Sequence, residues 1–78
     1  MRVFRERLKE LRRLKGITQK QLADIIGTNN SSISDWECGR TEPSVEAIIK
    51  LALYFDVTSD YLLGIEDESG VRLKEYVR

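Results

Sequence analysis

The stretch of residues 18–40 constrains the fold of this chain more than any other. It contains two short segments with apolar residues at helical spacing, and Gly27 separates them. Thr18 can cap the first segment, and Gln21 three residues later completes a capping-box pattern. Asn29 can cap the second segment, because its side-chain oxygen can accept from a free backbone N–H. The pattern predicts two short helices joined by a sharp turn.

The flanking segments also have helical signals. A first helix is expected from about Val3 to Lys15, stopped by Gly16. A fourth helix is expected over Val45–Phe55 with Ser44 as its cap. A short fifth helix, capped by Thr58, is expected to end at Gly64. No convincing strand pattern precedes residue 64, so the predicted fold class is all-α with five short helices. The residues expected to face inward or fill junctions are Phe4, Leu8, Leu11, Leu14, Ile17, Leu22, Ala23, Ile26, Ile33, Trp36, Ile48, Leu51, Ala52 and Phe55.

Size and composition exclude several classes of protein. A chain of 78 residues is one domain at most, with a modest core. A single cysteine and no histidine argue against a disulfide framework or a metal site, and a reduced, cytoplasmic setting is the default. No apolar run approaches a membrane span, and the start of the chain is too charged for a signal peptide. No catalytic constellation or phosphate-cradling glycine loop is present, so neither an enzyme nor a cofactor is expected.

The formal net charge is zero, but the charges are separated along the chain. Residues 1–20 carry eight Lys or Arg against two Glu, a local charge of +6. Residues 41–68 carry one Lys against seven Asp or Glu, a local charge of −6. Such an asymmetric field can orient a protein on a polyanion. The alternative is that both blocks are ordinary solvated helix faces.

The window from Gln19 to Cys38 has the spacing of a helix-turn-helix motif. Ala23 is small where the two helices would cross, and Gly27 can adopt the turn conformation. In the second helix only Ile33 and Trp36 would face inward, and the other side chains are small and polar or charged. We therefore expect residues 30–37 to enter the major groove of DNA. The alternative is a plain helical hairpin inside a small bundle.

Short motifs follow one another along the chain: Leu8-Lys9-Glu10-Leu11-Arg12, Thr18-Gln19-Lys20-Gln21-Leu22-Ala23, Gly27, Ile33-Ser34-Asp35-Trp36-Glu37-Cys38-Gly39-Arg40, Pro43-Ser44 and Asp60-Tyr61-Leu62-Leu63-Gly64. With these motifs the chain resembles the Cro and phage-repressor type of helix-turn-helix domain, also called XRE-like. The resemblance covers about residues 4–64. It implies a lambda-repressor-like DNA-binding domain over residues 1–64, with the motif at about 19–38. Such domains bind operator DNA, usually as two-fold dimers, and regulate transcription.

The resemblance also implies which residues contact DNA. Those implied to face base edges are Asn30, Ser31, Ser34 and Asp35. Those implied to contact phosphates are Arg12, Gln19, Lys20, Asn29, Ser32 and Arg40. Arg12 and Glu37 match a charge pair that ties the first helix to the recognition helix in related repressors. The alternative for most of these positions is an ordinary exposed polar residue.

Asp35 departs from the family pattern, which often has a basic or amide residue at this position. A carboxylate near phosphates is repelled unless it accepts from a cytosine amino group or is bridged by water. Cys38 is most simply a small residue at the start of the loop, and a thiol sensor is the alternative.

The expected function is sequence-specific binding of double-stranded DNA by a transcriptional repressor, as a homodimer on a palindromic operator. An isologous dimer would present two recognition helices about 34 Å apart. The tail, residues 65–78, is expected to be a dimerisation element or a linker, with a short helix near its end. The candidate dimer residues are Ile49, Leu53, Leu73, Tyr76 and Val77. The alternative function is a protein-interaction module, such as an antitoxin or an antagonist-binding partner, and apolar Ile25, Ile49 and Leu53 favour it.

Overall fold

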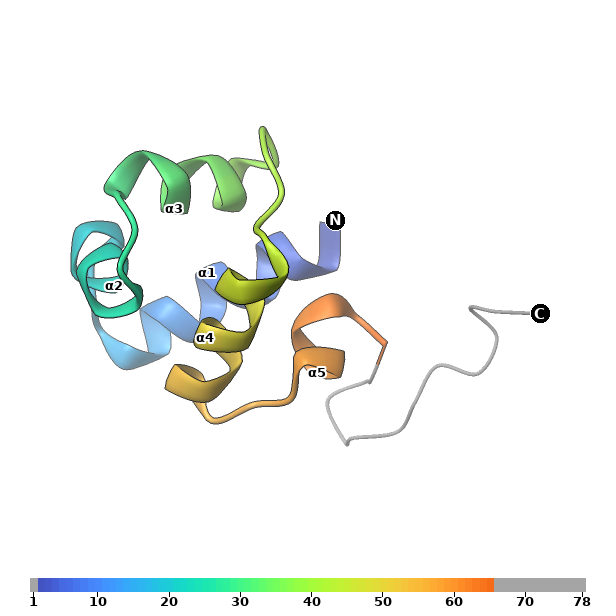
Figure 1. Cartoon of the computed structure of the whole chain (residues 1–78). Coiled ribbons are helices and arrows are strands. Elements are labelled where there is room, and N and C mark those ends of the chain that lie inside the picture. The colour runs from blue at the N-terminus through green and yellow to red at the C-terminus, as the bar shows by residue number, and fades with distance from the viewer. Residues whose placement is uncertain (1, 66–78) are drawn as a thin grey trace.

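The computed structural model describes residues 2–65 and shows five helices connected by short loops (Figure 1). The helices are α1 Arg2–Lys15, α2 Gln19–Ile26, α3 Asn30–Cys38, α4 Val45–Phe55 and α5 Ser59–Leu63. The predicted all-α fold class is therefore confirmed. Among residues 2–65 no helix is both long and apolar enough to cross a bilayer. The expected short helix and dimer residues at Leu73, Tyr76 and Val77 lie outside the described residues.

Four of the helices begin at polar capping residues. The Thr18 hydroxyl accepts from the backbone N–H of Gln21 at 3.0 Å, and the Gln21 side chain accepts from the Thr18 N–H at 2.8 Å. Asn29, Ser44 and Thr58 each accept in the same way from the residue three positions later. Each cap satisfies a donor that would have no intrahelical partner, typically worth about 1 kcal/mol. The predicted helix starts at these positions are confirmed.

The turn between α2 and α3 depends on a left-handed residue. Gly27 has φ 77° and ψ 39°, and its N–H donates to the carbonyl of Ala23. The Thr28 N–H donates to the same Ala23 carbonyl, at 2.8 Å. A side chain at Gly27 would strain this backbone, because the left-handed region favours glycine. The turn brings α3 across α2 at the angle seen at the upper left of Figure 1.

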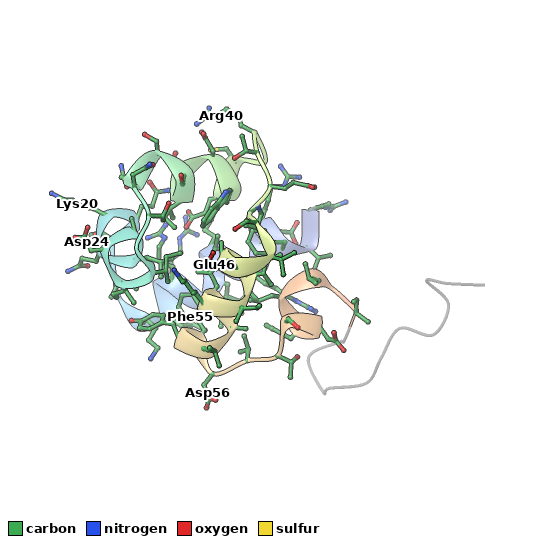
Figure 2. The ribbon with its side chains drawn as sticks, viewed as in Figure 1. Lys20, Asp24, Arg40, Glu46, Phe55 and Asp56 are labelled. Atoms are coloured by element: carbon green, nitrogen blue, oxygen red, sulfur yellow. The ribbon has the colours of Figure 1, made fainter. Side chains whose placement is uncertain are left out.

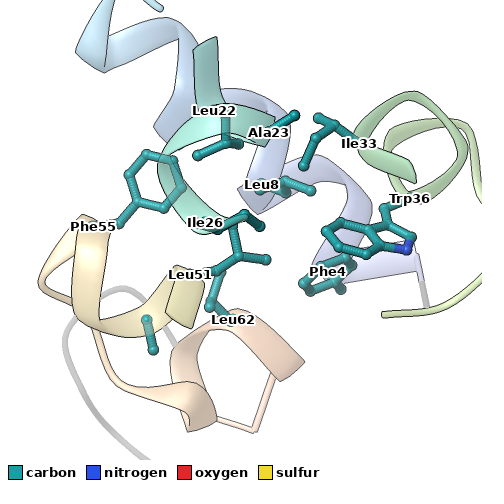
Figure 3. Close-up of a cluster of buried hydrophobic side chains, with 11 residues drawn as sticks. Phe4, Leu8, Leu22, Ala23, Ile26, Ile33, Trp36, Leu51, Phe55 and Leu62 are labelled. Atoms are coloured by element: carbon teal, nitrogen blue, oxygen red, sulfur yellow. The ribbon is translucent and has the colours of Figure 1, made fainter. Parts of the chain in front are cut away.

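All five helices contribute to one apolar core (Figure 3). Leu8, Leu22, Ile33, Leu51 and Leu62, one from each helix, are completely buried. The remaining buried apolar residues are Phe4, Ala23, Ile26, Trp36, Ala52 and Phe55. Since α3 contributes only Ile33 and Trp36 to this cluster, the core holds that helix by one side and leaves the other side free.

Leu14 is not part of the junction between α1 and the rest of the core, contrary to our expectation. Its side chain is 76% exposed. Leu14 lies six residues after Leu8, which at about 100° per residue turns it roughly 120° away from the buried side of α1. The neighbouring Ile17 does pack partly buried against the core, as expected.

Helix α5 packs against helix α1. The Arg7 guanidinium lies over the Tyr61 ring, 4.1 Å from its centroid, and donates to the Tyr61 carbonyl. At the end of α5, Gly64 has φ 85°, and a Cβ added there would lie 3.0 Å from the Val3 side chain. Close approach of α1 and α5 closes the domain around its core.

Candidate nucleic-acid interface

Helix α3 has one apolar side and one polar side. Ile33 and Trp36 face the core, with relative exposures of 0% and 8%. Asn30 and Ser31 are exposed in the first turn. Ser34 and Asp35 follow one turn later on the same polar side and are partly exposed. The four residues predicted to face base edges therefore share one side of α3, opposite the two core residues.

The residues predicted to contact phosphates occupy less uniform positions. Lys20 is exposed on α2 and extends away from the domain (Figure 2). Asn29 uses its Oδ1 as the α3 cap, accepting from the Ser32 N–H at 2.8 Å, so a phosphate contact by its side chain would use the amide nitrogen as donor. The first N–H groups of α2, at Gln19 and Lys20, have no intrahelical acceptor and suit an anion.

Three side chains from different helices form a buried polar network beneath α3. Arg12 donates to both oxygens of Glu37, through Nε to Oε2 at 2.6 Å and through Nη2 to Oε1 at 3.0 Å. Gln19 also donates to Oε1 of Glu37, at 3.1 Å. The remaining Arg12 nitrogen, Nη1, donates to the Ile17 carbonyl at 3.0 Å. The network ties the end of α3 to α1 and to the start of α2.

The Glu37 side chain is 3% exposed, and its ionisation depends on these partners. Burial alone raises the pKa of Glu37, but the hydrogen bonds from Arg12 and Gln19 and the positive charges of Arg12 and Lys9 outweigh it. The pKa of Glu37 is therefore lowered from its ordinary value. The hydrogen bond to Glu37 raises the pKa of Arg12, although desolvation opposes it. Both groups are charged at neutral pH, so their two hydrogen bonds form a bidentate ion pair.

The network changes how two predicted phosphate contacts are understood. All three Arg12 nitrogens donate within the domain, and the Gln19 amide donates to Glu37. The bond between Gln19 and Glu37 spans 18 residues and was not anticipated from the sequence. No local pattern reveals it, because only the crossing of α2 and α3 brings the two side chains together. A phosphate contact by either residue stays a prediction.

A second ion pair lies on the polar side of α3, also near its C-terminal end. Arg40 Nε donates to Oδ1 of Asp35 at 2.8 Å, and the Arg40 backbone N–H donates to the Asp35 carbonyl at 2.9 Å. The hydrogen bond to Asp35 raises the pKa of Arg40, and the negative charge of Asp35 adds to this rise. Sequence reasoning assigned the two residues to separate roles, a base contact and a phosphate contact. The structure joins them across the left-handed Gly39.

Charged side chains of α1, more of them basic than acidic, lie beside the end of α3. Arg2, Arg5, Lys9 and Arg13 line a surface hollow of about 560 Å³ together with Glu6, Glu10, Leu14 and Glu37. Arg5 also donates to the Cys38 carbonyl at 3.2 Å, where the α3 dipole is negative. Half of the eight basic residues in the block of residues 1–20 therefore lie beside α3, with three carboxylates among them.

Apolar side chains are exposed on a different part of the domain. Ile25 is 47% exposed, Ile49 50% and Leu53 77%, as their helical positions predict. Ile25 and Leu53 line a surface hollow of about 450 Å³ with Tyr54. Cys38 is an exposed free thiol at the end of α3.

The arrangement of α2 and α3 matches a known family. The helix-turn-helix family model matches residues 8–62, which is most of the chain. The chain belongs to the Cro and phage-repressor type of helix-turn-helix proteins. Members of this family are transcription regulators and not enzymes.

Individual helix-turn-helix relatives support this assignment. The chain is 39% identical over 64 residues to the transcriptional activator BcrR of Enterococcus faecalis, covering 82% of the chain and 31% of BcrR. It is 36% identical over 64 residues to the transcriptional regulator ImmR of Bacillus subtilis, covering 82% of the chain and 50% of ImmR. The chain thus spans half or less of the length of these two curated relatives.

A solved helix-turn-helix structure shares the fold. The P22 c2 repressor, in complex with a synthetic operator, has a TM-score of 0.73 and 33% sequence identity. The match covers 77% of this chain and 91% of that one. At this level of similarity the five-helix architecture is that of phage-repressor DNA-binding domains.

Proposed function

We propose that this domain binds double-stranded operator DNA in a sequence-specific manner and represses transcription. One observation carries the proposal. The only apolar side chains that α3 buries are Ile33 and Trp36. Its other side presents Asn30, Ser31 and the residues one turn later. Small polar side chains at the start of a helix suit the donor and acceptor groups of the major groove. A helix needed only for the core would bury a wider apolar side.

The charges of the domain support contact with the DNA backbone. Lys20 and the first N–H groups of α2 lie at one end of the helix-turn-helix. Near the other end, α1 contributes four basic side chains, Arg2, Arg5, Lys9 and Arg13, to a hollow that also contains three carboxylates. Phosphate contacts provide most of the affinity of such proteins, whereas base contacts provide the sequence preference. The P22 c2 relative supports operator binding and repression, since its structure holds a synthetic operator and the protein is called a repressor.

The proposal includes a homodimer acting in the cytoplasm on a palindromic operator. Ile49 and Leu53 offer exposed apolar surface on α4 for an isologous contact. In such a dimer the two copies of α3 would enter successive major grooves about 34 Å apart. Native mass spectrometry of the whole chain on its selected DNA should then give two copies per duplex. One copy per duplex at saturation would contradict the dimer.

A salt titration tests the DNA-binding function directly. The affinity of the whole chain for random duplex DNA should fall steeply with salt, as a straight line of log affinity against log salt. Lys20→Ala should weaken binding to all sequences alike and reduce the slope by about 1. An affinity for DNA that does not change with salt would contradict the proposal.

Sites selected from a randomised duplex library test the role of α3. Asn30→Ala should change which sites are preferred, because its amide faces the base edges. Ser59→Ala, which alters an exposed polar residue in the first turn of α5, is the matched control and should select the wild-type sites. Identical preferred sites for Asn30→Ala and wild type would remove Asn30 from base recognition.

A protein-interaction module is the second candidate function. The hollow that Ile25, Leu53 and Tyr54 line, with charged Asp24 and Lys50 also in its wall, favours it. Exposed apolar surface of this kind often marks a protein contact. A module of this kind should bind random DNA weakly and without a steep dependence on salt. The same salt titration therefore separates the two functions.

A further inference from the structure

The ion pair between Asp35 and Arg40 is held by more than the attraction between its charges. Gly39, at φ 81°, turns the chain back at the end of α3, and the Arg40 N–H bonds to the Asp35 carbonyl at 2.9 Å. This backbone bond places the Arg40 side chain next to the Asp35 carboxylate, where Nε donates to Oδ1 at 2.8 Å. The backbone at the end of α3 therefore fixes the positions from which the two side chains meet.

The pair leaves donors and an acceptor for a ligand. The contact uses one carboxylate oxygen and the Nε of the guanidinium. Oδ2 of Asp35 remains as an acceptor, and the two terminal nitrogens of Arg40 remain as donors. The Asp35 side chain is 33% exposed and the Arg40 side chain 64%. Both therefore reach solvent on or beside the polar side of α3.

Arg40 removes the main objection to a carboxylate in the groove. An isolated Asp35 would be repelled by the DNA phosphates, whereas the pair has no net charge. The choice of base then follows from the major-groove pattern. Guanine and thymine present acceptors that repel a carboxylate, and adenine presents an acceptor beside its amino group. Cytosine presents an amino donor with no neighbouring acceptor.

We infer that Asp35 and Arg40 act as one unit in base recognition. Oδ2 of Asp35 accepts from the N4 amino group of a cytosine, while Arg40 neutralises the carboxylate, holds its orientation and donates to a nearby phosphate. The inference rests on the proposed function and adds the base that is read. Arg40 is thereby a positioning residue for specificity in addition to a backbone contact.

The inference predicts opposite effects of the two partners on affinity. Asp35→Asn should reduce the ratio of its affinity for the cytosine site to its affinity for the other bases by about fivefold to tenfold, as expected for one lost base contact. It should also bind random DNA at least as tightly as wild type, because Arg40 is released to phosphates and a negative charge is removed. Arg40→Gln should bind all DNA more weakly and also lose the cytosine preference, because the carboxylate is no longer neutralised.

The experiment begins with selection of sites by the whole chain from a randomised duplex library, for wild type, Asp35→Asn, Arg40→Gln and the double variant. Equilibrium binding is then measured on four duplexes that differ only at the base pair whose preference Asp35→Asn changes. Glu42→Gln is the matched control, since it removes a negative charge from the same loop and should leave every base preference unchanged. Thermal melts by circular dichroism show that each variant is folded.

The outcomes distinguish this inference from the proposed function. The expected result is a cytosine preference in wild type that either single substitution removes and that the double variant does not reduce further. If wild type selects no site and its binding does not depend on salt, the proposed function itself fails. If wild type selects sites but both single variants keep the same base at every position, the inference is overturned. It is also overturned if Asp35→Asn alone changes the preference, because Asp35 would then read the base without Arg40.

Discussion

Removing the Glu37 carboxylate should destabilise the domain more than any other change to a single charged side chain considered above. In Glu37→Ala, Arg12 loses both side-chain hydrogen bonds and keeps only the bond from Nη1 to the Ile17 carbonyl. Gln19 loses its acceptor as well. The variant therefore leaves a largely buried guanidinium without a counter-charge, and α3 loses its ion pair with α1.

The magnitude follows from the burial of the two partners. Breaking one side of a buried ion pair typically costs about 3–5 kcal/mol. The Arg12 side chain retains 14% of its exposure, so water can partly replace Glu37 and the expected loss is about 3 kcal/mol. A domain of this size is stable by only about 3–10 kcal/mol. The loss corresponds to a fall in melting temperature of roughly 12–24 °C.

Urea unfolding at pH 7, followed by circular dichroism, measures this loss. The matched control is Glu6→Ala, which breaks an exposed ion pair with Arg2 on α1, where the two side chains are 66% and 82% exposed. An exposed pair of this kind contributes at most about 0.5 kcal/mol. The double variant Arg12→Ala with Glu37→Ala should cost less than the sum of the single variants, because neither charge is left alone. A surface ion pair contributes roughly 1 kcal/mol at most. If the free energies of unfolding of Glu37→Ala and Glu6→Ala differ by less than about 1 kcal/mol, the structural role of the network is refuted.

Three further predictions concern stability. The pKa of Glu37 is lower in the folded chain than in the unfolded chain, so its ionisation stabilises the fold above the unfolded-state pKa of about 4.3. This stabilisation is lost as the pH falls through the folded-state pKa. Between pH 7 and pH 3 the urea midpoint should therefore fall less in Glu37→Gln than in wild type, and equal falls would contradict this. Asp56 ends α4 with φ 55° and a negative charge at the negative end of the helix dipole. Asp56→Asn keeps a residue that tolerates this conformation and should stabilise by about 0.5 kcal/mol in thermal melts, whereas a lower melting temperature would refute the dipole argument. Gly64→Ala should cost more than Gly16→Ala, because both positions have positive φ but only Gly64 meets Val3, at 3.0 Å. Gly16→Ala should cost about 1 kcal/mol, and equal losses in the two variants would show that the contact with Val3 relaxes freely.

Much of the fold could be predicted because its signals are local. Thr18, Asn29, Ser44 and Thr58 were each expected to begin a helix, and each accepts the capping hydrogen bond in the structure. The polar side of α3 was visible for the same reason, since side chains at known helical spacing share a side. Leu14 was misplaced because its apolar character suggested burial, while its position on the helix turns it to solvent.

The sequence by itself determined where each helix begins and ends and which side of α3 is polar, because caps, turns and periodicity act over three or four residues. Only the tertiary structure decided what the polar and charged side chains do. The family resemblance implied the pair of Arg12 and Glu37, which are 25 residues apart and do form an ion pair. Gln19, 18 residues from Glu37, joins this pair only because the packing of α1, α2 and α3 brings the three side chains together. Asp35 and Arg40 are close in sequence, yet their pairing required the left-handed turn that folds the chain back at the end of α3. Charge partners depend on distances in space, which no local pattern specifies.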